Sequence, residues 1–159
     1  MLVAVISDTH MPRGRRRLPV EHLAGADAIL HAGDLMERSV LAELQALGPP
    51  VHAVRGNVDD GWLMARLPLQ RTLELGGVRI GMIHDAGHKE GRLERLRRRF
   101  PDERAVIFGH SHIPLHEEAG GFQIFNPGSP TERRRAPKHT MGEAEASGGT
   151  LAFRLIELD

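Results

Sequence analysis

Residues 28–34 read Ala-Ile-Leu-His-Ala-Gly-Asp, an apolar run that stops at Gly33 and then presents one carboxylate, Asp34. The run predicts a buried strand, so the aspartate at its end places a charge at the edge of a hydrophobic core. Burying that carboxylate without a partner would cost several kcal/mol or force its protonation. We therefore expect positive charge beside Asp34, and metal ions are its predicted source.

Two further stretches share this plan. Residues 2–6 (LVAVI) lead into Ser7-Asp8-Thr9-His10, and residues 51–54 (VHAV) are followed after one residue by Gly56-Asn57. Short, continuous apolar runs of this kind predict central strands that are buried on both faces. Open α/β sheets bind ligands outside the carboxyl ends of their strands, so we expect the three polar endings to share one site.

The remaining chain adds helices and hairpins. Apolar residues at helical spacing predict helices over about 18–23, 36–47 and 89–100. Gly-Gly turns join two predicted hairpins, with strands over 69–75 and 78–83 and over 115–118 and 122–125. Further strands are predicted over 105–108 and 151–158, whereas 137–149 lacks periodicity and is expected to be a surface loop or poorly ordered. This pattern predicts an α/β fold of two packed sheets with helices outside.

The composition is that of an ordinary globular protein, with 159 residues, 40% of them hydrophobic and 26% charged. This length fits one domain over residues 1–159. The formal net charge is zero, so no global field attracts nucleic acid or an anionic membrane. No apolar run reaches transmembrane length and residues 2–6 are too short for a signal peptide, so we expect a cytoplasmic protein.

Polar residues at the predicted strand ends offer hard oxygen and borderline nitrogen donors. They are Asp8, His10, Asp34, Asn57, His84, His110 and His112. The chain has no cysteine, which excludes thiolate ligands. This donor set suits two adjacent ions of manganese, iron, zinc or nickel, with manganese favoured. A bridging carboxylate would neutralise part of both charges, and Asp34 is the candidate bridge.

Paired ions about 3.5 to 4 Å apart can hold phosphoryl oxygens and lower the pKa of a bridging water. The predicted chemistry is therefore hydrolysis of a phosphoester by attack of a metal-bridging hydroxide. This scheme needs no serine or cysteine nucleophile, and the sequence contains no nucleophile elbow or Walker-type loop.

Five motifs follow one another along the chain: Asp8-Thr9-His10, Gly33-Asp34, Gly56-Asn57, His84 and Gly109-His110-Ser111-His112. In order and spacing they resemble the five blocks of the calcineurin-like metallophosphoesterases. The chain looks most like the small bacterial and archaeal phosphodiesterase branch, which has a similar Asn-Pro-Gly-Ser segment, here residues 126–129. The resemblance covers essentially the whole chain and implies a four-layer α/β/β/α sandwich with metals at the strand ends.

The resemblance also implies a role for each matching residue. The first metal would be bound by Asp8, His10 and His112, and the second by Asn57, His84 and His110. Asp34 would bridge the two metals. The predicted catalytic residues are Asp34, Asn57, His110 and His88.

Two departures from the family pattern concern the general acid. Many members carry a histidine after the Gly-Asn pair, where it is thought to protonate the leaving group, but this chain has Val58. The small branch usually reads His-Gly-His at the fourth block, whereas this chain has His84-Asp85-Ala86-Gly87-His88. His110 and His88 are the candidates for a substitute proton donor.

The arginine clusters and one proline-containing segment each allow two interpretations. Arg13–Arg17 follows the first motif and is either a phosphate-recruiting lip or a solvated loop. Arg92–Arg99 is better explained as a charged helix face than as a nucleic-acid groove, because no aromatic residues interleave with the arginines. Arg133–Arg135 stays open, and residues 126–130 either shape the pocket wall or change the strand direction.

We expect a phosphodiesterase that acts on a small phosphorylated substrate, as a monomer or homo-oligomer, without specific nucleic-acid binding or membrane association. The alternative is a non-catalytic metal-binding scaffold or interaction module of the same fold. A eukaryotic retromer subunit resembles this family and serves as a scaffold, so the fold alone does not imply turnover.

Overall fold

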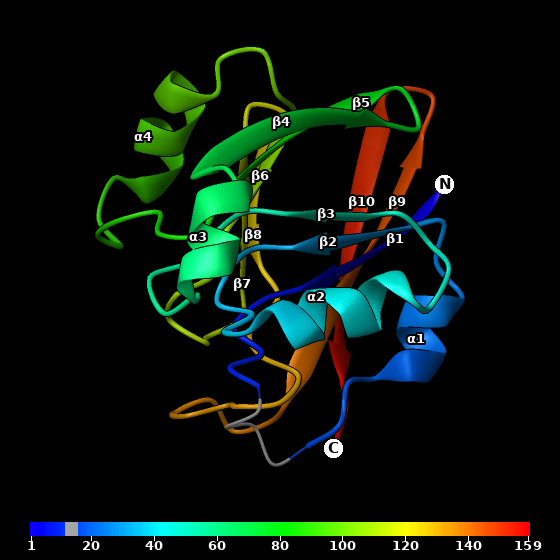
Figure 1. The fold of residues 1–159 in the computed structure, drawn as a ribbon. Coiled ribbons are helices and arrows are strands. Elements are labelled where there is room, and N and C mark those ends of the chain that lie inside the picture. The colour runs from blue at the N-terminus through cyan, green and yellow to red at the C-terminus, as the bar shows by residue number, and fades with distance from the viewer. Residues whose placement is uncertain (12–15) are drawn as a thin grey trace.

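The computed structural model describes residues 1–11 and 16–159, which form two five-stranded mixed sheets (Figure 1). The first sheet has the order β10-β9-β1-β2-β3. Its strands are β1 (Leu2–Ile6), β2 (Ala28–His31), β3 (Val51–Ala53), β9 (Thr140–Ser147) and β10 (Thr150–Glu157). Strands β1, β2 and β3 are parallel, so their polar endings lie at one edge, while β9 runs antiparallel to β1 and β10.

The second sheet has the order β4-β5-β6-β8-β7. Its strands are β4 (Gln70–Leu75), β5 (Val78–Ile83), β6 (Ala105–Ile107), β7 (Leu115–Ala119) and β8 (Phe122–Asn126). Strands β5, β6 and β8 are parallel in the centre. The edge strands β4 and β7 pair antiparallel with their neighbours, through the two predicted Gly-Gly hairpins.

Helices cover the outer faces of the two sheets. They are α1 (Val20–Ala24), α2 (Arg38–Gln45), α3 (Gly61–Arg66) and α4 (Arg92–Arg99). One core joins α1, α2 and α3 to the first sheet, a second lies between the sheets, and a third joins α4 to the second sheet. The layers are therefore α/β/β/α, which confirms the predicted fold class.

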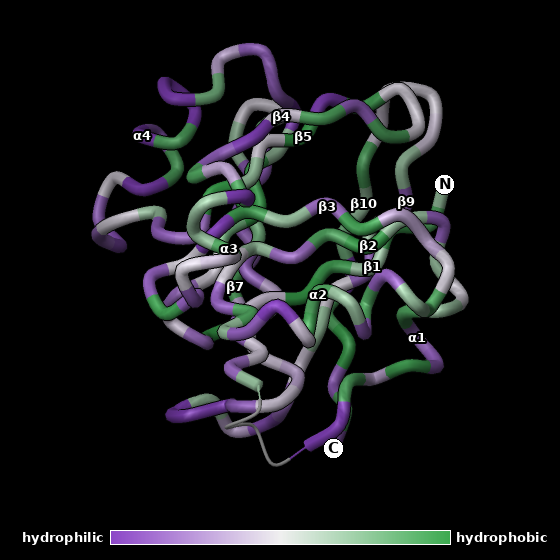
Figure 2. Tube along the Cα trace, viewed as in Figure 1, coloured by the Kyte–Doolittle hydropathy of each residue, from purple (hydrophilic) through white to green (hydrophobic). Residues whose placement is uncertain are grey.

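Alternate residues of the central strands face different cores, because side chains along a strand alternate between its faces. Val3 and Val5 pack between the sheets, whereas Ala4 and Ile6 pack beneath the helices. Burial on both faces explains why these strands are continuously apolar. Figure 2 shows this hydrophobic colouring along β1 and β2, in contrast to the hydrophilic chain around α4.

The prediction of a loop over residues 137–149 is wrong for most of that range, since Thr140–Ser147 forms β9. The inward side of this strand carries small residues, including Gly142 and Ala144. A Cβ at Gly142 would collide with the ring of Phe125, so the close approach of the two sheets requires glycine here. Small residues carry little hydrophobic signal, which hid the strand in the sequence.

The short helix α3 was not predicted either. Asp60 is its N-cap residue, and Oδ1 of Asp60 accepts a hydrogen bond of 2.9 Å from the backbone N–H of Leu63. The other helices lie within about two to three residues of their predicted ends. In the described part of the chain, no helix has the length and apolarity needed to cross a membrane.

Candidate metal centre

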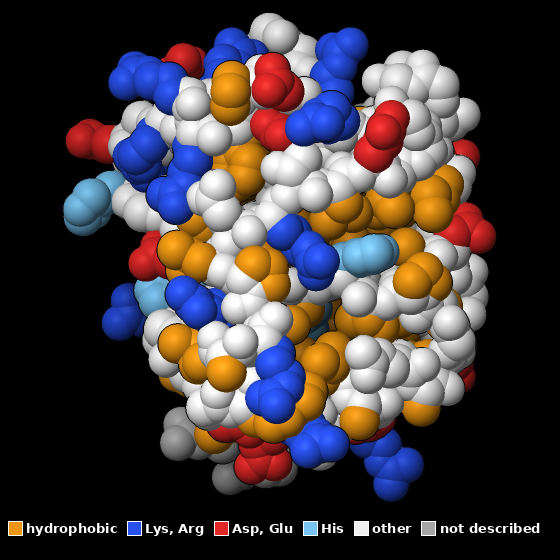
Figure 3. Space-filling model, turned by 45° about the horizontal axis from the view of Figure 1, so that its top comes forward, with side chains coloured by type: hydrophobic (Ala, Val, Ile, Leu, Met, Phe, Trp, Pro, Cys, Tyr) orange, Lys and Arg blue, Asp and Glu red, His pale blue; other side chains and the backbone are white. Residues whose placement is uncertain are grey.

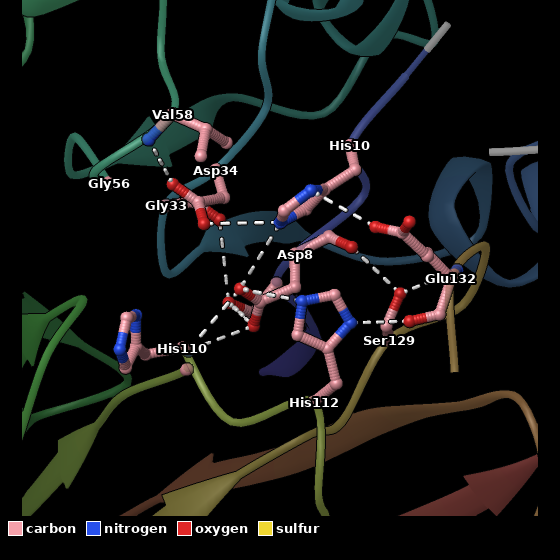
Figure 4. A network of polar contacts seen from close by, with 12 residues as sticks. Asp8, His10, Gly33, Asp34, Gly56, Val58, His110, His112, Ser129 and Glu132 are labelled. Carbon is pink, nitrogen blue, oxygen red and sulfur yellow. Dashed lines mark hydrogen bonds and ion pairs between the residues drawn. The ribbon is translucent and has the colours of Figure 1, made fainter. Parts of the chain in front are cut away.

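The seven predicted ligands all lie in loops that follow strands of the two sheets. Asp8 and His10 follow β1, Asp34 follows β2, Asn57 follows β3, His84 follows β5, and His110 and His112 follow β6. The loops of both sheets meet at one end of the sandwich, so residues up to 104 positions apart in the chain become neighbours. The structure thus brings the whole set into one polar cluster. Figure 4 shows Asp8, His10, Asp34, His110 and His112 of this set.

Asp8, His10 and His112 form the first ligand group. Oδ1 of Asp8 lies 3.9 Å from Nε2 of His10 and 3.6 Å from Nε2 of His112. All three residues are buried, with at most 2% of their surface exposed. One donor atom from each lies within 4.8 Å of the other two, which is close enough for all three to share a metal ion.

Asp34 connects this group to a second one that contains His84, Asn57 and His110. Oδ2 of Asp34 lies 3.1 Å from Nε2 of His10 and 3.1 Å from Nε2 of His84. Oδ1 of Asn57 lies 3.1 Å from Nε2 of His84 and 3.2 Å from Nδ1 of His110. Asn57 and His110 are exposed, so the second group faces solvent.

Hydrogen bonds outside the cluster orient two of the imidazoles. Nδ1 of His84 donates to the carbonyl of Ala32 at 2.7 Å, and Nδ1 of His112 donates to the carbonyl of Glu132. A carbonyl can only accept, so in each ring Nδ1 carries the proton. In the neutral ring, Nε2 then presents its lone pair to the cluster, as metal-ligating histidines do.

The donor set and one unpaired atom both fit a divalent cation. Nε2 of His112 is buried and has no hydrogen-bond partner among the described residues. Burial lowers the pKa of His112, which keeps its imidazole neutral and its lone pair available. Carboxylate and imidazole donors together suit manganese, iron, zinc or nickel, and a cation between Asp8 and His112 would satisfy the unpaired nitrogen.

Without a cation, the carboxylates and imidazoles neutralise one another. Burial by itself lowers the pKa of His10, but hydrogen bonds and charge from Asp34 and Asp8 overcome it and raise this pKa to about 9. Burial would raise the pKa of Asp34, yet His10 and His84 hold it well below its usual range. The pKa of His84 is raised against burial by the same two aspartates. A bound cation would take over this role and release the protons.

The backbone conformation of the ligand loops orients the side chains of the predicted ligands. Five of the ligands adopt a left-handed backbone that is uncommon outside glycine: Asp8 (φ 57°), His10 (φ 47°), Asp34 (φ 62°), His110 (φ 76°) and His112 (φ 62°). Strained residues of this kind cluster at functional sites. His110 and His112, two residues apart, would share one face of a straight strand. The left-handed turns instead direct His110 to Asn57 and His112 to Asp8.

Two glycines allow the ligand loops to approach each other. A Cβ at Gly56 would collide with the carboxylate of Asp34, and a Cβ at Gly33 would lie 2.6 Å from Nδ1 of His84. Gly33 also has a φ of 101°, which L side chains rarely adopt. The glycines before Asp34 and Asn57 are therefore needed for close packing as well as for the turns.

Asp59 organises two ligand loops, and the sequence analysis missed it. This residue is 8% exposed, and Oδ2 accepts from the backbone N–H groups of Gly56 at 2.6 Å and Asp34 at 3.2 Å. Oδ1 accepts from the N–H of Met36 at 2.7 Å. One buried carboxylate thus ties the loop after β2 to the loop after β3. An aspartate two residues after Asn57 was the available signal.

The Asn-Pro-Gly-Ser segment supports the loops from the other side. Ser129 donates its hydroxyl to the carbonyl of Asp8 at 2.8 Å, and Thr131 donates to that of Thr9 at 2.5 Å. Nδ2 of Asn126 donates to the carbonyl of Gly109 at 3.1 Å. Residues 126–131 therefore hold the loops after β1 and β6 in place, beyond changing the strand direction.

Residues 1–149 match a family model described as the calcineurin-like phosphoesterase superfamily domain. The chain belongs to this superfamily. It is 37% identical over 139 residues to a probable metallophosphoesterase of Methanothermobacter thermautotrophicus, a match that covers 84% of this chain and 80% of that protein. The family binds divalent metals, and two buried clusters could hold them: Asp8, His10 and His112, and Asp8, Asp34 and His84.

Two solved structures share the phosphoesterase fold of this chain. Vacuolar protein sorting 29 from Cryptosporidium parvum superposes with a TM-score of 0.85 at 23% identity, covering 99% of this chain and 91% of that one. A structure titled as a novel archaeal phosphodiesterase superposes with a TM-score of 0.74 at 19% identity, covering 98% and 100%. At these identities the likeness shows the fold alone.

His88 stands apart from the predicted ligands. The residue is exposed on the loop before α4, and its carbonyl accepts a hydrogen bond of 2.6 Å from Arg95. No hydrogen bond within residues 1–11 and 16–159 involves its side chain. Oδ1 of Asp85 accepts from the N–H of Gly87 at 2.9 Å, which forms a tight turn between His84 and His88.

The arginine clusters have different surroundings. Arginines of α4 gather with other basic side chains on one side of the molecule (Figure 3), and Arg95 there donates to the carbonyls of Ala86 and Glu90 as well. This supports the interpretation as a helix face. Within Arg13–Arg17, residues up to 15 lie outside the described residues, and Arg16 pairs with the carboxylate of Asp159.

Proposed function

We propose that the chain is a dinuclear metal-dependent phosphoesterase that hydrolyses phosphodiesters, with residues 1–159 as one domain. The position of Asp34 supports this most directly, because its Oδ2 is 3.1 Å from Nε2 of both His10 and His84. One carboxylate oxygen between imidazoles of two different ligand groups is placed where it could bridge two neighbouring cations.

The proposed ligand roles follow from these groups. One cation would be held by Asp8, His10 and His112, the other by Asn57, His84 and His110, with Asp34 touching both. Oδ1 of Asp8 also lies 3.8 Å from Nε2 of His84, so Asp8 stands close to the second group. Manganese is the first ion to test, ahead of iron, zinc and nickel.

When bound, the cations would supply Lewis acidity toward phosphoryl oxygens and a water nucleophile of lowered pKa. The chain contributes orientation and access. The N–H of Val58 donates to Oδ1 of Asp34 at 3.0 Å, which leaves Oδ2 to face the histidines. The exposed residues Asn57 and His110 form the approach for a small phosphorylated substrate above the buried Asp8.

The leaving group sets a limit on the substrate. The side chain of Val58 has no proton to transfer to a leaving group. Phosphodiesters with acidic leaving groups should therefore react faster than those with alkyl leaving groups. His110 is the first candidate for a substitute acid, because it is exposed and lies beside Asn57. His88 is the second candidate and would have to approach from its own loop.

Turnover of bis(p-nitrophenyl) phosphate by the manganese-loaded protein tests the proposal. Asp34→Asn and His112→Ala should lower kcat/KM by at least about 100-fold, because losing an outer hydrogen-bond partner of a ligand already costs about 10- to 100-fold. His22→Ala, a change of an exposed histidine on α1, is the matched control and should keep wild-type activity. Equal turnover in the wild type and all three variants would contradict the proposal.

A second candidate function is a non-catalytic metal-binding module, favoured by the superposition on vacuolar protein sorting 29. The two functions separate in one experiment. Two bound metal ions without turnover of any phosphomonoester or phosphodiester would support the module, whereas turnover that disappears in Asp34→Asn would support the enzyme.

A further inference from the structure

Glu132 contacts His10 and His112 of the first ligand group directly and reaches Asp8 through Ser129 (Figure 4). Its backbone carbonyl accepts the hydrogen bond from Nδ1 of His112, and its carboxylate Oε2 lies 3.0 Å from Nδ1 of His10. Its backbone N–H donates to Oγ of Ser129 at 2.8 Å, and that hydroxyl donates to the carbonyl of Asp8 at 2.8 Å. One residue therefore connects to all three ligands.

The side chain of Glu132 is only partly buried, and its Oε2 atom lies on the buried side, toward the site. Oε2 is buried and has no hydrogen bond among the described residues, although 32% of the side chain is exposed. A buried carboxylate oxygen is costly without an N–H or a positive group beside it. The imidazole of His10, at ion-pair distance, is the group placed to meet that need.

We propose that Glu132 is a positioning residue for the metal site of Asp8, His10 and His112, an inference that rests on the proposed function. The carboxylate at Nδ1 of His10 would hold the ring with Nε2 toward the cluster and make it a stronger donor. The backbone carbonyl of Glu132 holds the ring of His112 in the same way. The two imidazoles of the first site thus depend on one residue, which the motif pattern did not single out.

The two contacts of Glu132 can be separated by substitution. The carbonyl that holds His112 belongs to the backbone and survives any side-chain change, whereas Glu132→Gln removes the negative charge beside His10 and keeps the size. Outer carboxylate partners of metal-ligating histidines are worth about 10- to 100-fold in affinity. We therefore expect Glu132→Gln to lower the metal affinity of one site by about this factor and to leave the affinity of the other site unchanged.

Calorimetric titration of metal-free protein with Zn²⁺, in competition with a chelator, measures both sites without relying on turnover. Glu145→Gln, a change of an exposed glutamate on β9, is the matched control and should bind as the wild type does. Cadmium-113 NMR of the loaded protein adds a readout of position: one of two resonances should shift in Glu132→Gln. The thermal midpoint of the metal-free variant, measured beside these, shows whether the substitution affects the fold as a whole.

Each outcome decides one question. Wild-type affinity at both sites in Glu132→Gln would overturn the positioning role and leave the dinuclear proposal standing. Equal losses at both sites, together with a lower metal-free midpoint, would also overturn it by showing a general structural effect. A wild-type protein that binds fewer than two ions would overturn the dinuclear proposal itself, and the positioning role would fall only if the single remaining site were unaffected by the substitution.

Discussion

Histidines of the same chain have opposite roles according to which ring nitrogen carries the proton. His84 and His112 donate from Nδ1 to carbonyls and turn Nε2 toward the carboxylates. His31 is reversed: Nδ1 accepts from the N–H of Gly33 at 3.1 Å, so Nε2 donates to Oγ1 of Thr9, also at 3.1 Å. His31 therefore stabilises the turn that presents Asp34 and cannot ligate a metal in this position.

His31 should make the metal-free protein less stable in acid. Burial lowers its pKa in the folded chain from 6.5 to about 3. Above about pH 6.5 the imidazole is neutral in both states, but between about pH 6.5 and about pH 3 the unfolded chain takes up a proton that the folded chain does not. The free energy of unfolding should then fall by up to about 1.4 kcal/mol for each pH unit of acidification.

Urea unfolding of wild type and His31→Gln between about pH 5 and about pH 7 checks this expectation. The wild type should lose more stability toward low pH than the variant, whose side chain does not titrate. His22→Gln changes an exposed histidine and should keep the wild-type slope. Parallel curves for wild type and His31→Gln would show that His31 does not carry the effect.

At the scale of elements, the loop between β3 and α3 carries both a predicted metal ligand and a helix cap. Asn57 belongs to the ligand set, Asp59 ties this loop to that of Asp34, and Asp60 begins α3. Oδ2 of Asp60 also accepts from the N–H of Arg38 at 3.3 Å, which joins α3 to the start of α2. Asp59 thus anchors this loop to the loop of Asp34, and Asp60 anchors it to the helical layer.

Asp60→Ala should lower the free energy of unfolding by about 1 kcal/mol, the usual cost of losing an N-cap side chain. Glu37→Ala is the matched control, because Glu37 occupies the N-cap of α2 without a capping hydrogen bond from its side chain. The urea midpoint of the Glu37 variant should stay near wild type. A loss of equal size in both variants would mean that the cap bond of α3 contributes nothing.

At the scale of the molecule, the candidate metal centre combines residues of the two sheets. Asp8, His10, Asp34 and Asn57 come from loops of the first sheet, whereas the remaining three histidines of the set come from the second. A cation bound by ligands from both sheets would hold the sandwich together at that end. Binding to the folded state alone must also stabilise it.

Mn²⁺ should therefore raise the thermal midpoint of the metal-free protein. At a free concentration about 100 times Kd the added stability is about 2.7 kcal/mol for each site. Differential scanning calorimetry with and without the ion measures the shift, and a chelator should reverse it. Asp34→Asn should lose most of the shift. An unchanged wild-type midpoint in the presence of Mn²⁺ would argue against a metal site that spans the sheets.

Much of the fold followed from local patterns. The apolar runs of β1 and β2, the Gly-Gly hairpins and the helical spacing of α2 and α4 each reflect neighbours in the chain. The sequence by itself therefore determined the two-sheet class and the order of all elements except α3 and β9. Strand β9 escaped because its inward residues Gly142 and Ala144 are too small to carry a hydrophobic signal. Helix α3 is too short for its periodicity to stand out.

For the site, the sequence by itself determined the ligand types and their place at strand ends, and the superfamily motifs fixed which residues to expect. Only the tertiary structure decided how they are oriented. The carbonyls at His84 and His112, the carboxylates of Asp59 and Glu132, and the unpaired Nε2 of His112 all arise from contacts between distant loops. Hydrogen-bond direction and burial depend on these contacts in space, and no spacing along the chain encodes them.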